Sequence, residues 1–514
     1  MNLRTKLGQM ICVGYDGLSP SEEFLHMIDE YKVGNIPLFR HNFESAQQAK
    51  QSVEALYNYV TAATGYPPIL SVDQEGGMVT RFSDDFTHFP GAMAVAATRN
   101  SEYAYQLGYL TGLEIKNIGA NWDLAPVADI NTNVSNPVIG VRSYGDTVSQ
   151  VIEFSGAMID GLEAANVGSM MKHFPGHGDT HQDSHFSLPR IEKTYEELLE
   201  CELKPFIEGI KQGVPGIMTS HIIFPAIDPS GVPATMSKII ITDILRKKLG
   251  FEGIIRTDDL EMDAIAKHYG IVEGAVMAIK AGVDIISMSR SPHLVKELVE
   301  RVENEISNGL LPMELIDNAF NRIVKIKARY CRSVPHNLSV IGCSAHKNLA
   351  NEISQNSITL IRTKENQIPV RSENLLVVGT HAFNQTNIHN PLLLELNFAN
   401  LVSNALHGTG ITISVKPTDE EITQVMKAAQ AADTIIFGTY NAHLFDGQVQ
   451  LANFLAATGK NLILAAMRNP YDATVLPTQT TLLACYEYTP CSINTLISVL
   501  SGELKPTGHL PITL

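Results

Sequence analysis

The stretch from Lys172 to Pro189, KHFPGHGDTHQDSHFSLP, holds the residues of this chain that are best suited to chemistry. Four histidines recur every four residues, with aspartates between them: His173, His177, His181 and His185, with Asp179 and Asp183. On an unbroken helix this spacing would display the rings on one face, as a metal site does. Proline and glycine interrupt the run, so we predict a loop that can hold a proton-transfer pair, and no metal.

Eight short apolar runs in the first two-thirds of the chain predict the strands that position this loop. They are residues 10–15, 35–39, 68–73, 121–126, 168–173, 216–221, 253–258 and 284–289. Helix-like stretches separate most of them, which is typical of a (β/α)8 TIM-like barrel. A doubly wound open sheet is the alternative.

Polar residues end several of these runs, although a strand buried on both faces has little reason to finish in charge. They are Asp73, Lys172 with His173, Ser220 with His221, Asp258, and Ser287 with Ser289. The carboxyl ends of barrel strands meet at one face, where active sites lie. We therefore expect a shared pocket there.

The pattern changes after about Arg332 and predicts a second domain. A stretch with few helical or strand repeats follows, and then six further apolar runs with some helix-like stretches between them. We predict a barrel over residues 1–333, a linker over 334–350 and a smaller α/β sandwich domain with a mostly parallel sheet over 351–514. Neither a phosphate loop nor a GxGxxG fingerprint is present, and we expect no cofactor.

Composition indicates a compact soluble protein, with 44% hydrophobic and 18% charged residues among 514. The net charge of −16 argues against a nucleic-acid partner. The six cysteines form no CxxC pair, so we expect reduced thiols. The N-terminus does not resemble a signal peptide, and no apolar run is long enough to span a membrane. We expect a cytoplasmic protein, unless a leader has been removed.

Four motifs in order along the first domain resemble family 3 glycoside hydrolases. They are SVDQEGGMVTRF (71–82), APVADINTN with NPVIGVRSYG (within 125–145), the stretch 172–189, and GIIRTDDLEM (253–262). The DSH of residues 183–185 resembles the bacterial β-N-acetylglucosaminidase branch of that family. The second domain resembles the C-terminal domain of its longer members.

The resemblance implies the roles of particular residues. Asp258, directly after Thr257, matches the nucleophile of a retaining mechanism, with its neighbour Asp259 as the competitor. His185 matches the general acid/base, and Asp183 would orient its ring. Five further positions match groups that hold sugar hydroxyls: Asp73, Arg81, Arg142, Lys172 and His173.

Other residues of these motifs have plainer interpretations or depart from the family. Arg81 and Arg142 can equally be ion-pair partners, Glu75 a structural partner, and His177, Asp179 and His181 can shape the loop; His221 can contact substrate. Arg256 replaces a residue that is usually apolar, and Glu261 one that is usually small or polar. By strand alternation Arg256 shares a face with Asp258, where it can influence that carboxylate or pair with Glu261.

These features predict a retaining exo-β-N-acetylglucosaminidase that acts on small chitin or cell-wall (muropeptide) fragments. Phosphorolysis stays open, because an imidazole acid/base does not repel a phosphate acceptor. Two competing hypotheses are a β-glucosidase or β-xylosidase of the same family and a non-enzymatic carbohydrate-binding protein. The sequence leaves the oligomeric state and the role of the second domain open.

Overall fold

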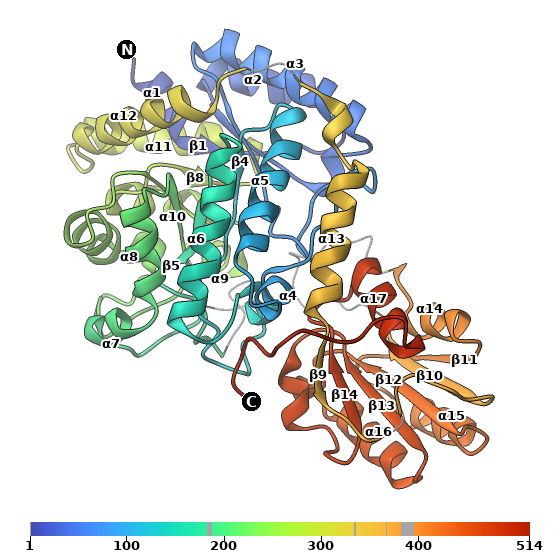
Figure 1. Ribbon diagram of the computed structural model, residues 1–514. Helices are drawn as coiled ribbons and strands as arrows, with labels where there is room; N and C mark the ends of the chain where they lie inside the picture. The colour runs from blue at the N-terminus through green and yellow to red at the C-terminus, as the bar shows by residue number, and fades with distance from the viewer. Residues whose placement is uncertain (1, 182–187, 334–335, 366, 382–394) are drawn as a thin grey trace.

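The computed structural model describes residues 2–181, 188–333, 336–365, 367–381 and 395–514. It contains a barrel, coloured blue to yellow in Figure 1, and a smaller sheet domain, coloured orange to red. The two are in contact, and helix α13 (Ser344–Ser357) runs from one to the other.

Eight short parallel strands form the barrel, one at each predicted apolar run. They are β1 (Ile11–Cys12), β2 (Asn35–Leu38), β3 (Ile69–Val72), β4 (Trp122–Asp123), β5 (Met170–Phe174), β6 (Gly216–Thr219), β7 (Ile254–Arg256) and β8 (Ile286–Ser287). They pair in the orders β4-β3-β2-β1-β8 and β5-β6-β7. Bridges from Trp122 to Gly168 and from Arg256 to Ile285 join the two groups. The closed ring confirms the predicted (β/α)8 barrel.

Helices surround these strands and bury their apolar sides against them. They are α1 (Leu3–Met10), α2 (Glu22–Tyr31), α3 (Ala46–Thr64), α4 (Ala92–Ala97), α5 (Glu102–Asn117), α6 (Val148–Ala164), α7 (Tyr195–Glu200), α8 (Leu203–Gln212), η4 (Ile239–Lys248), α9 (Asp263–Ala266), α10 (Ile271–Ala281), α11 (Val295–Ser307) and α12 (Met313–Tyr330). Local sequence sets their ends: Ser45 caps α3 by accepting the Gln48 N–H, and Gly65 ends it with a φ of 80°.

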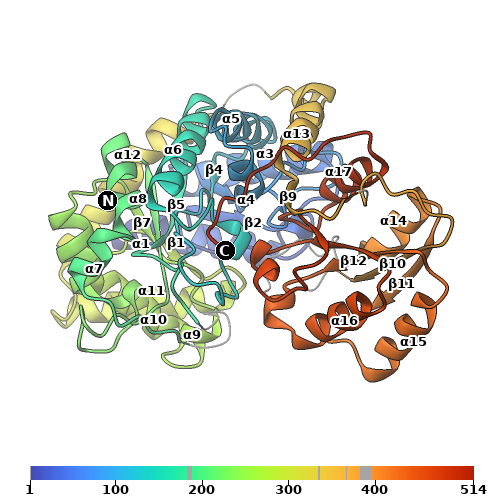
Figure 2. The same ribbon diagram turned by 60° about the horizontal axis from the view of Figure 1, so that its bottom comes forward.

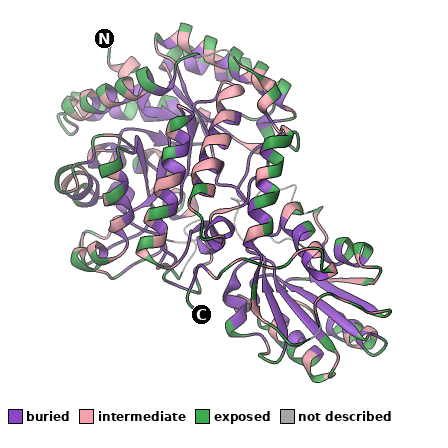
Figure 3. Ribbon diagram, viewed as in Figure 1, coloured by how far each residue is buried: buried purple, intermediate pink, exposed green. Residues whose placement is uncertain are grey.

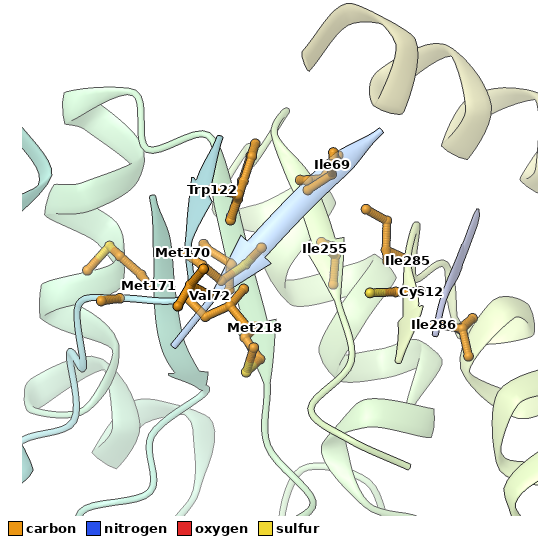
Figure 4. Close-up of a cluster of buried hydrophobic side chains, with 14 of the residues drawn as sticks. Cys12, Ile69, Val72, Trp122, Met170, Met171, Met218, Ile255, Ile285 and Ile286 are labelled. Carbon is orange, nitrogen blue, oxygen red and sulfur yellow. The ribbon is translucent and has the colours of Figure 1, made fainter. Parts of the chain in front are cut away.

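Apolar side chains fill the base of the barrel around Trp122, as Figure 4 shows. Two glycines make room for the indole. A Cβ on Gly168 would lie 2.3 Å from its ring, and one on Gly216 would lie 2.9 Å from it. The chemistry of the barrel is therefore confined to the other end of the strands, where the polar residues begin.

The second domain is one sheet with helices on both faces. Its strands are β9 (Thr359–Arg362), β10 (Leu375–Thr380), β11 (Thr409–Ile413), β12 (Thr434–Thr439), β13 (Asn461–Ala466) and β14 (Thr481–Ala484), in the order β11-β10-β12-β13-β14-β9. Only β9 among these six is antiparallel to its neighbour, so the predicted mostly parallel sheet is confirmed. Helices α14 (Phe398–Ala405), α15 (Asp419–Ala429), α16 (Asp446–Ala457) and α17 (Pro490–Ser501) cover it. In Figure 3 the inner strands β10, β12, β13 and β14 are almost entirely buried, while the edge strands β9 and β11 and the outer helix faces are more exposed.

The predicted linker, residues 334–350, is only partly irregular. It contains a short 3-10 turn, η6 (Leu338–Val340), and the first half of α13. The helix packs against α4 of the barrel and α17 of the second domain. The domain limits at 333 and 351 stay predictions, but the structure replaces irregular chain by helix from residue 344.

The last residues of the sequence return to the barrel (Figure 2). The His509 N–H donates to the Ala97 carbonyl at 2.8 Å, and the Thr513 N–H donates to Asp146 Oδ2 at 2.7 Å. Ile512 joins a buried cluster with Val141 of the barrel and Tyr471 of the second domain. None of the helices in the described ranges is long and apolar enough to cross a membrane.

Candidate active site

A cavity of about 280 Å³ opens at the carboxyl ends of the barrel strands. It brings together every described residue to which the sequence assigned a catalytic or sugar-binding role: Asp73, Arg81, Arg142, Lys172, His173 and Asp258. The expected shared pocket is therefore present, although Ser220 and His221, which the sequence placed in it, are not among the residues that line it. Asp183 and His185 lie outside the described residues, so their placement stays a prediction.

A network of buried charges forms one wall of this cavity. Glu75 accepts two hydrogen bonds from Arg142, from Nε and Nη2, both at 2.8 Å. Lys172 Nζ lies 2.6 Å from Glu75 and 3.0 Å from Asp73, and Arg81 lies 3.7 Å from the other oxygen of Asp73. The ion-pair and sugar-binding interpretations of the two arginines are thus compatible, since both side chains are paired and also line the cavity.

The network fixes the charges of its members. Burial alone would raise the pKa of Glu75, but the cations of Arg142 and Lys172 outweigh it and hold the pKa well below its usual range. Burial is likewise outweighed at Asp73, whose pKa Lys172 and Arg81 lower. Asp73 keeps oxygens that can accept sugar hydroxyls, while Arg and Lys can only donate.

His173 is oriented by a carboxylate that the sequence did not single out. Asp129 Oδ2 lies 2.7 Å from His173 Nδ1, and the same carboxylate accepts the backbone N–H groups of His173 at 3.2 Å and His177 at 2.7 Å. The His173 Nε2 atom lies 3.5 Å from Arg142 Nη2, on the cavity side. Asp129 therefore fixes the ring and ties the loop to the end of β5.

The end of β7 places two neighbouring carboxylates in different environments. Asp258 is partly exposed in the cavity, and its Oδ1 accepts the Asp259 N–H at 2.8 Å. Asp259 turns to the backbone N–H groups of Glu261 at 3.2 Å and Ser289 at 3.3 Å. Burial and the charge of Glu261 raise the pKa of Asp259 to about 6. Asp259 is held by the backbone, which favours Asp258 as the nucleophile.

The sequence left two roles open for Arg256, and one of them was an ion pair with Glu261. Arg256 does not form this pair. Its Nε donates to Ser287 Oγ at 2.8 Å and its Nη1 to Ser71 Oγ at 2.9 Å. Glu261 instead accepts the backbone N–H of Arg290 at 2.7 Å. Arg256 is 3% exposed, so its side chain extends across the barrel interior, and Glu261 lies at the rim.

Two further histidines of the loop, His177 and His181, have partners within the protein. His177 Nδ1 lies 3.0 Å from Thr180 Oγ1, and His181 Nδ1 lies 2.9 Å from Asn133 Nδ2. Asp179 pairs with Lys193 at 2.8 Å. In the ranges that the structure covers, no three His, Cys, Asp or Glu side chains are grouped as metal ligands. These contacts agree with loop-shaping roles.

His221, which the sequence offered as a possible substrate contact, is buried and turned to the protein. Its Nε2 lies 3.0 Å from the Asp259 carbonyl oxygen and its Nδ1 lies 2.9 Å from Thr235 Oγ1. It therefore supports the backbone behind the two aspartates that follow β7.

Proteins with sequences similar to this chain are named as glycosidases. It is 29% identical to the "Beta-hexosaminidase A" of Pseudoalteromonas piscicida, over 96% of this chain and 91% of that one. It is 33% identical to the "Beta-hexosaminidase" of Alkalilimnicola ehrlichii, over 57% and 84%. With the barrel and its carboxylate-lined cavity, these similarities identify the protein as a glycoside hydrolase. The model of the "Glycosyl hydrolase family 3 N terminal domain" matches residues 2–326, and the chain belongs to glycosyl hydrolase family 3.

Solved structures agree with this assignment over both domains. A family 3 β-N-acetylglucosaminidase from Paenibacillus sp. str. FPU-7 is 35% identical, with a TM-score of 0.93 over 100% of this chain and 99% of that one. A "Beta-glucoside phosphorylase BglX bound to 2FGlc" is 22% identical with a TM-score of 0.84, which shows a shared fold only.

Proposed function

We propose that this glycoside hydrolase is a retaining exo-β-N-acetylglucosaminidase that releases terminal β-linked GlcNAc from small chitin or cell-wall fragments. The observation that carries the proposal is that one cavity joins Asp258 to all five candidate sugar-binding residues. The names of its relatives support the sugar. An exo-acting pocket holds the terminal sugar inside and leaves the rest of the substrate at the rim.

Asp258 and His185 divide the chemistry of the proposed mechanism. The Asp258 carboxylate attacks the anomeric carbon and forms a glycosyl ester, while His185, held by Asp183, protonates the departing oxygen. His185 then takes a proton from water, which attacks the ester and releases the sugar with its original configuration. Lys172, Arg81 and Asp73 bind its hydroxyls, and Arg142, fixed by Glu75, supports this wall.

Two variants and two leaving groups test both roles together. Wild-type enzyme should hydrolyse p-nitrophenyl β-GlcNAc faster than the β-glucoside and release free GlcNAc, not the sugar 1-phosphate, in phosphate buffer. Asp258→Ala should leave under about a thousandth of the activity on p-nitrophenyl β-GlcNAc and on N,N′-diacetylchitobiose alike. His185→Ala should lose far more activity on diacetylchitobiose, because a nitrophenolate leaves with little protonation.

The outcomes separate the parts of the proposal. Faster turnover of the β-glucoside would contradict the sugar assignment. Full activity in Asp258→Ala would contradict the nucleophile, for which Asp259→Ala is the matched comparison. Equal losses of His185→Ala on both substrates would contradict its role as the acid.

A further inference from the structure

Arg256 places a charged side chain in the interior of the barrel, which branched apolar residues usually fill. It ends β7, with Met218 of β6 and Ile285, just before β8, as its partners on the adjacent strands. Its side chain lines the catalytic cavity, yet the residue is only 3% exposed. A guanidinium at this depth requires hydrogen-bond partners.

Two hydroxyls from distant strands fix the guanidinium. Ser287 of β8 accepts from Nε at 2.8 Å, and Ser71 of β3 accepts from Nη1 at 2.9 Å. A guanidinium carries five N–H donors in one plane, so these two bonds set its orientation. Among the residues that the structure describes, Nη2 has no hydrogen-bond partner and no carboxylate oxygen lies within 4.0 Å of Arg256.

The three linked residues form a layer directly below the proposed sugar-binding layer. Ser71, Arg256 and Ser287 each stand two residues before a cavity residue, namely Asp73, Asp258 and Ser289. Side chains two apart on a strand share a face, about 6–7 Å apart along it. The guanidinium therefore forms part of the cavity floor, beneath the space that Asp73 and Asp258 flank.

We propose that Arg256 is a further substrate-binding residue, whose Nη2 donates a hydrogen bond from the cavity floor to a hydroxyl oxygen of the terminal sugar. The proposal rests on the proposed function, because the terminal sugar must occupy the inner end of the cavity. A bound sugar gives Nη2 an acceptor that the described residues of the protein do not supply. A site of this kind rejects sugars that lack the hydroxyl, since the donor is then left unpaired.

Substrates that each lack one hydroxyl identify the sugar hydroxyl to which Arg256 donates. The measurement is kcat/KM for the p-nitrophenyl glycoside that wild-type enzyme cleaves fastest and for its 3-deoxy, 4-deoxy and 6-deoxy analogues. On wild-type enzyme, removal of the contacted hydroxyl should lower kcat/KM by roughly 10- to 100-fold. In Arg256→Met that loss should shrink to less than about threefold, while the losses at the other two positions stay as in wild type.

Each loss is a ratio between two substrates on one preparation, so the fraction of folded enzyme cancels. Arg256→Gln provides the same comparison if the methionine variant does not fold. Arg290→Met is the matched control, because that rim arginine lies over Phe39, with its guanidinium carbon 5.9 Å from the ring centroid, and should leave all three losses unchanged. Identical losses at all three positions in wild-type and Arg256 variants would overturn the proposal.

The same experiment distinguishes a failure of the proposed function. If the enzyme prefers another sugar, the deoxy series is built on that sugar, and the effect of Arg256 is still measured. If the proposed function is wrong, the glycoside that the enzyme cleaves fastest is not the β-GlcNAc glycoside. An error about Arg256 appears only as unchanged ratios.

Discussion

Glu75 is the residue on which the charged wall of the cavity depends. Its two oxygens hold Arg142 and Lys172, and its side chain is 6% exposed. Without the negative charge of Glu75, the two cations would lie close together in a buried site with less negative charge to balance their repulsion. The proposed roles of Arg142 and Lys172 in the sugar-binding wall therefore depend on Glu75, even where Glu75 itself does not reach the substrate.

Glu75→Gln should reduce both stability and substrate affinity. Removing one charge from a buried ion pair destabilises a protein by about 3–5 kcal/mol, because the remaining charge is uncompensated. Urea and thermal unfolding would measure this loss, together with a rise in KM. The matched control is Glu192→Gln, which removes an exposed partner of Arg190 and should change stability by less than about 1 kcal/mol. Equal, small effects of both changes would contradict the account.

For individual residues, the sequence predicted which side chains line the cavity better than it predicted their ion-pair and hydrogen-bond partners. Asp73, Arg81, Arg142, Lys172, His173 and Asp258 all line the cavity, as their motifs indicated. The sequence does not single out Asp129, and it indicates Glu75 only as a structural partner of the strand end, without the two cations that Glu75 binds. The partners of Glu75 lie 67 and 97 positions away along the chain, and only the folded barrel brings them together.

The segment 175–181 is held in place as a unit at the mouth of the barrel. Asn136 donates to the carbonyl oxygens of His177 at 2.8 Å and Gly178 at 3.0 Å, and Asp129 accepts the His177 N–H. Gly178 lies so close to the loop after β4 that a Cβ would stand 1.7 Å from the Ile130 carbonyl oxygen. This segment leads directly to residues 183–185, so its anchoring bears on the proposed acid/base.

Gly178→Ala should therefore impair catalysis through the loop. The added methyl must push the segment away from Ile130, and a displacement of about 1 Å can cost on the order of 100-fold in rate. We expect that loss in kcat on diacetylchitobiose. Gly156→Ala is the control, because a Cβ there meets only the end of Gln212, at 3.2 Å, on a barrel helix. Full activity of Gly178→Ala would show that the loop tolerates displacement.

Strands were easier to predict than helix α13, for a physical reason. The strands of a parallel sheet are buried on both faces and appear as continuous apolar runs. Helix α13 buries His346, Ala350, Ile353, Ser354 and Ser357, a helical spacing made largely of small and polar residues. Its buried face is visible only once α4 and α17 are in place, so a hydrophobic pattern could not reveal it.

Across the whole molecule, Glu487 joins the second domain to the barrel. Its Oε2 accepts the Gly91 N–H of the barrel at 2.8 Å, and its Oε1 accepts from Thr489 at 2.9 Å. A small cavity beside it is also lined by Glu75 and Arg142. Burial raises the pKa of Glu487 to about 7. The contact between the domains therefore contains a group that titrates near neutral pH.

The raised pKa of Glu487 sets the direction in which the stability of the folded protein changes with pH. The folded protein holds this proton more tightly than the unfolded chain, whose glutamate has a pKa of 4.5. Its contribution to stability is therefore complete below pH 4.5 and is lost as the pH rises through about 7. Glu487→Gln imitates the protonated form. The melting temperature of this variant minus that of wild type should increase between pH 5 and pH 8.

The exposed Glu503 of the same domain provides the control, since Glu503→Gln should show no such increase. A difference for Glu487→Gln that is the same at both pH values would contradict the assignment of the titrating group.

Residues 509–513 return to the barrel, and Ile512 lies there in a buried cluster with Val141 and Tyr471. These contacts determine whether the two domains separate after proteolytic cleavage. A protease that nicks the connection between the barrel and the sheet domain removes one covalent link and leaves the other attachments intact. The two fragments would then co-elute in gel filtration under native conditions and separate only in denaturant. We therefore expect the two domains to stay associated after the cut, because the second domain contacts the barrel near both of its ends.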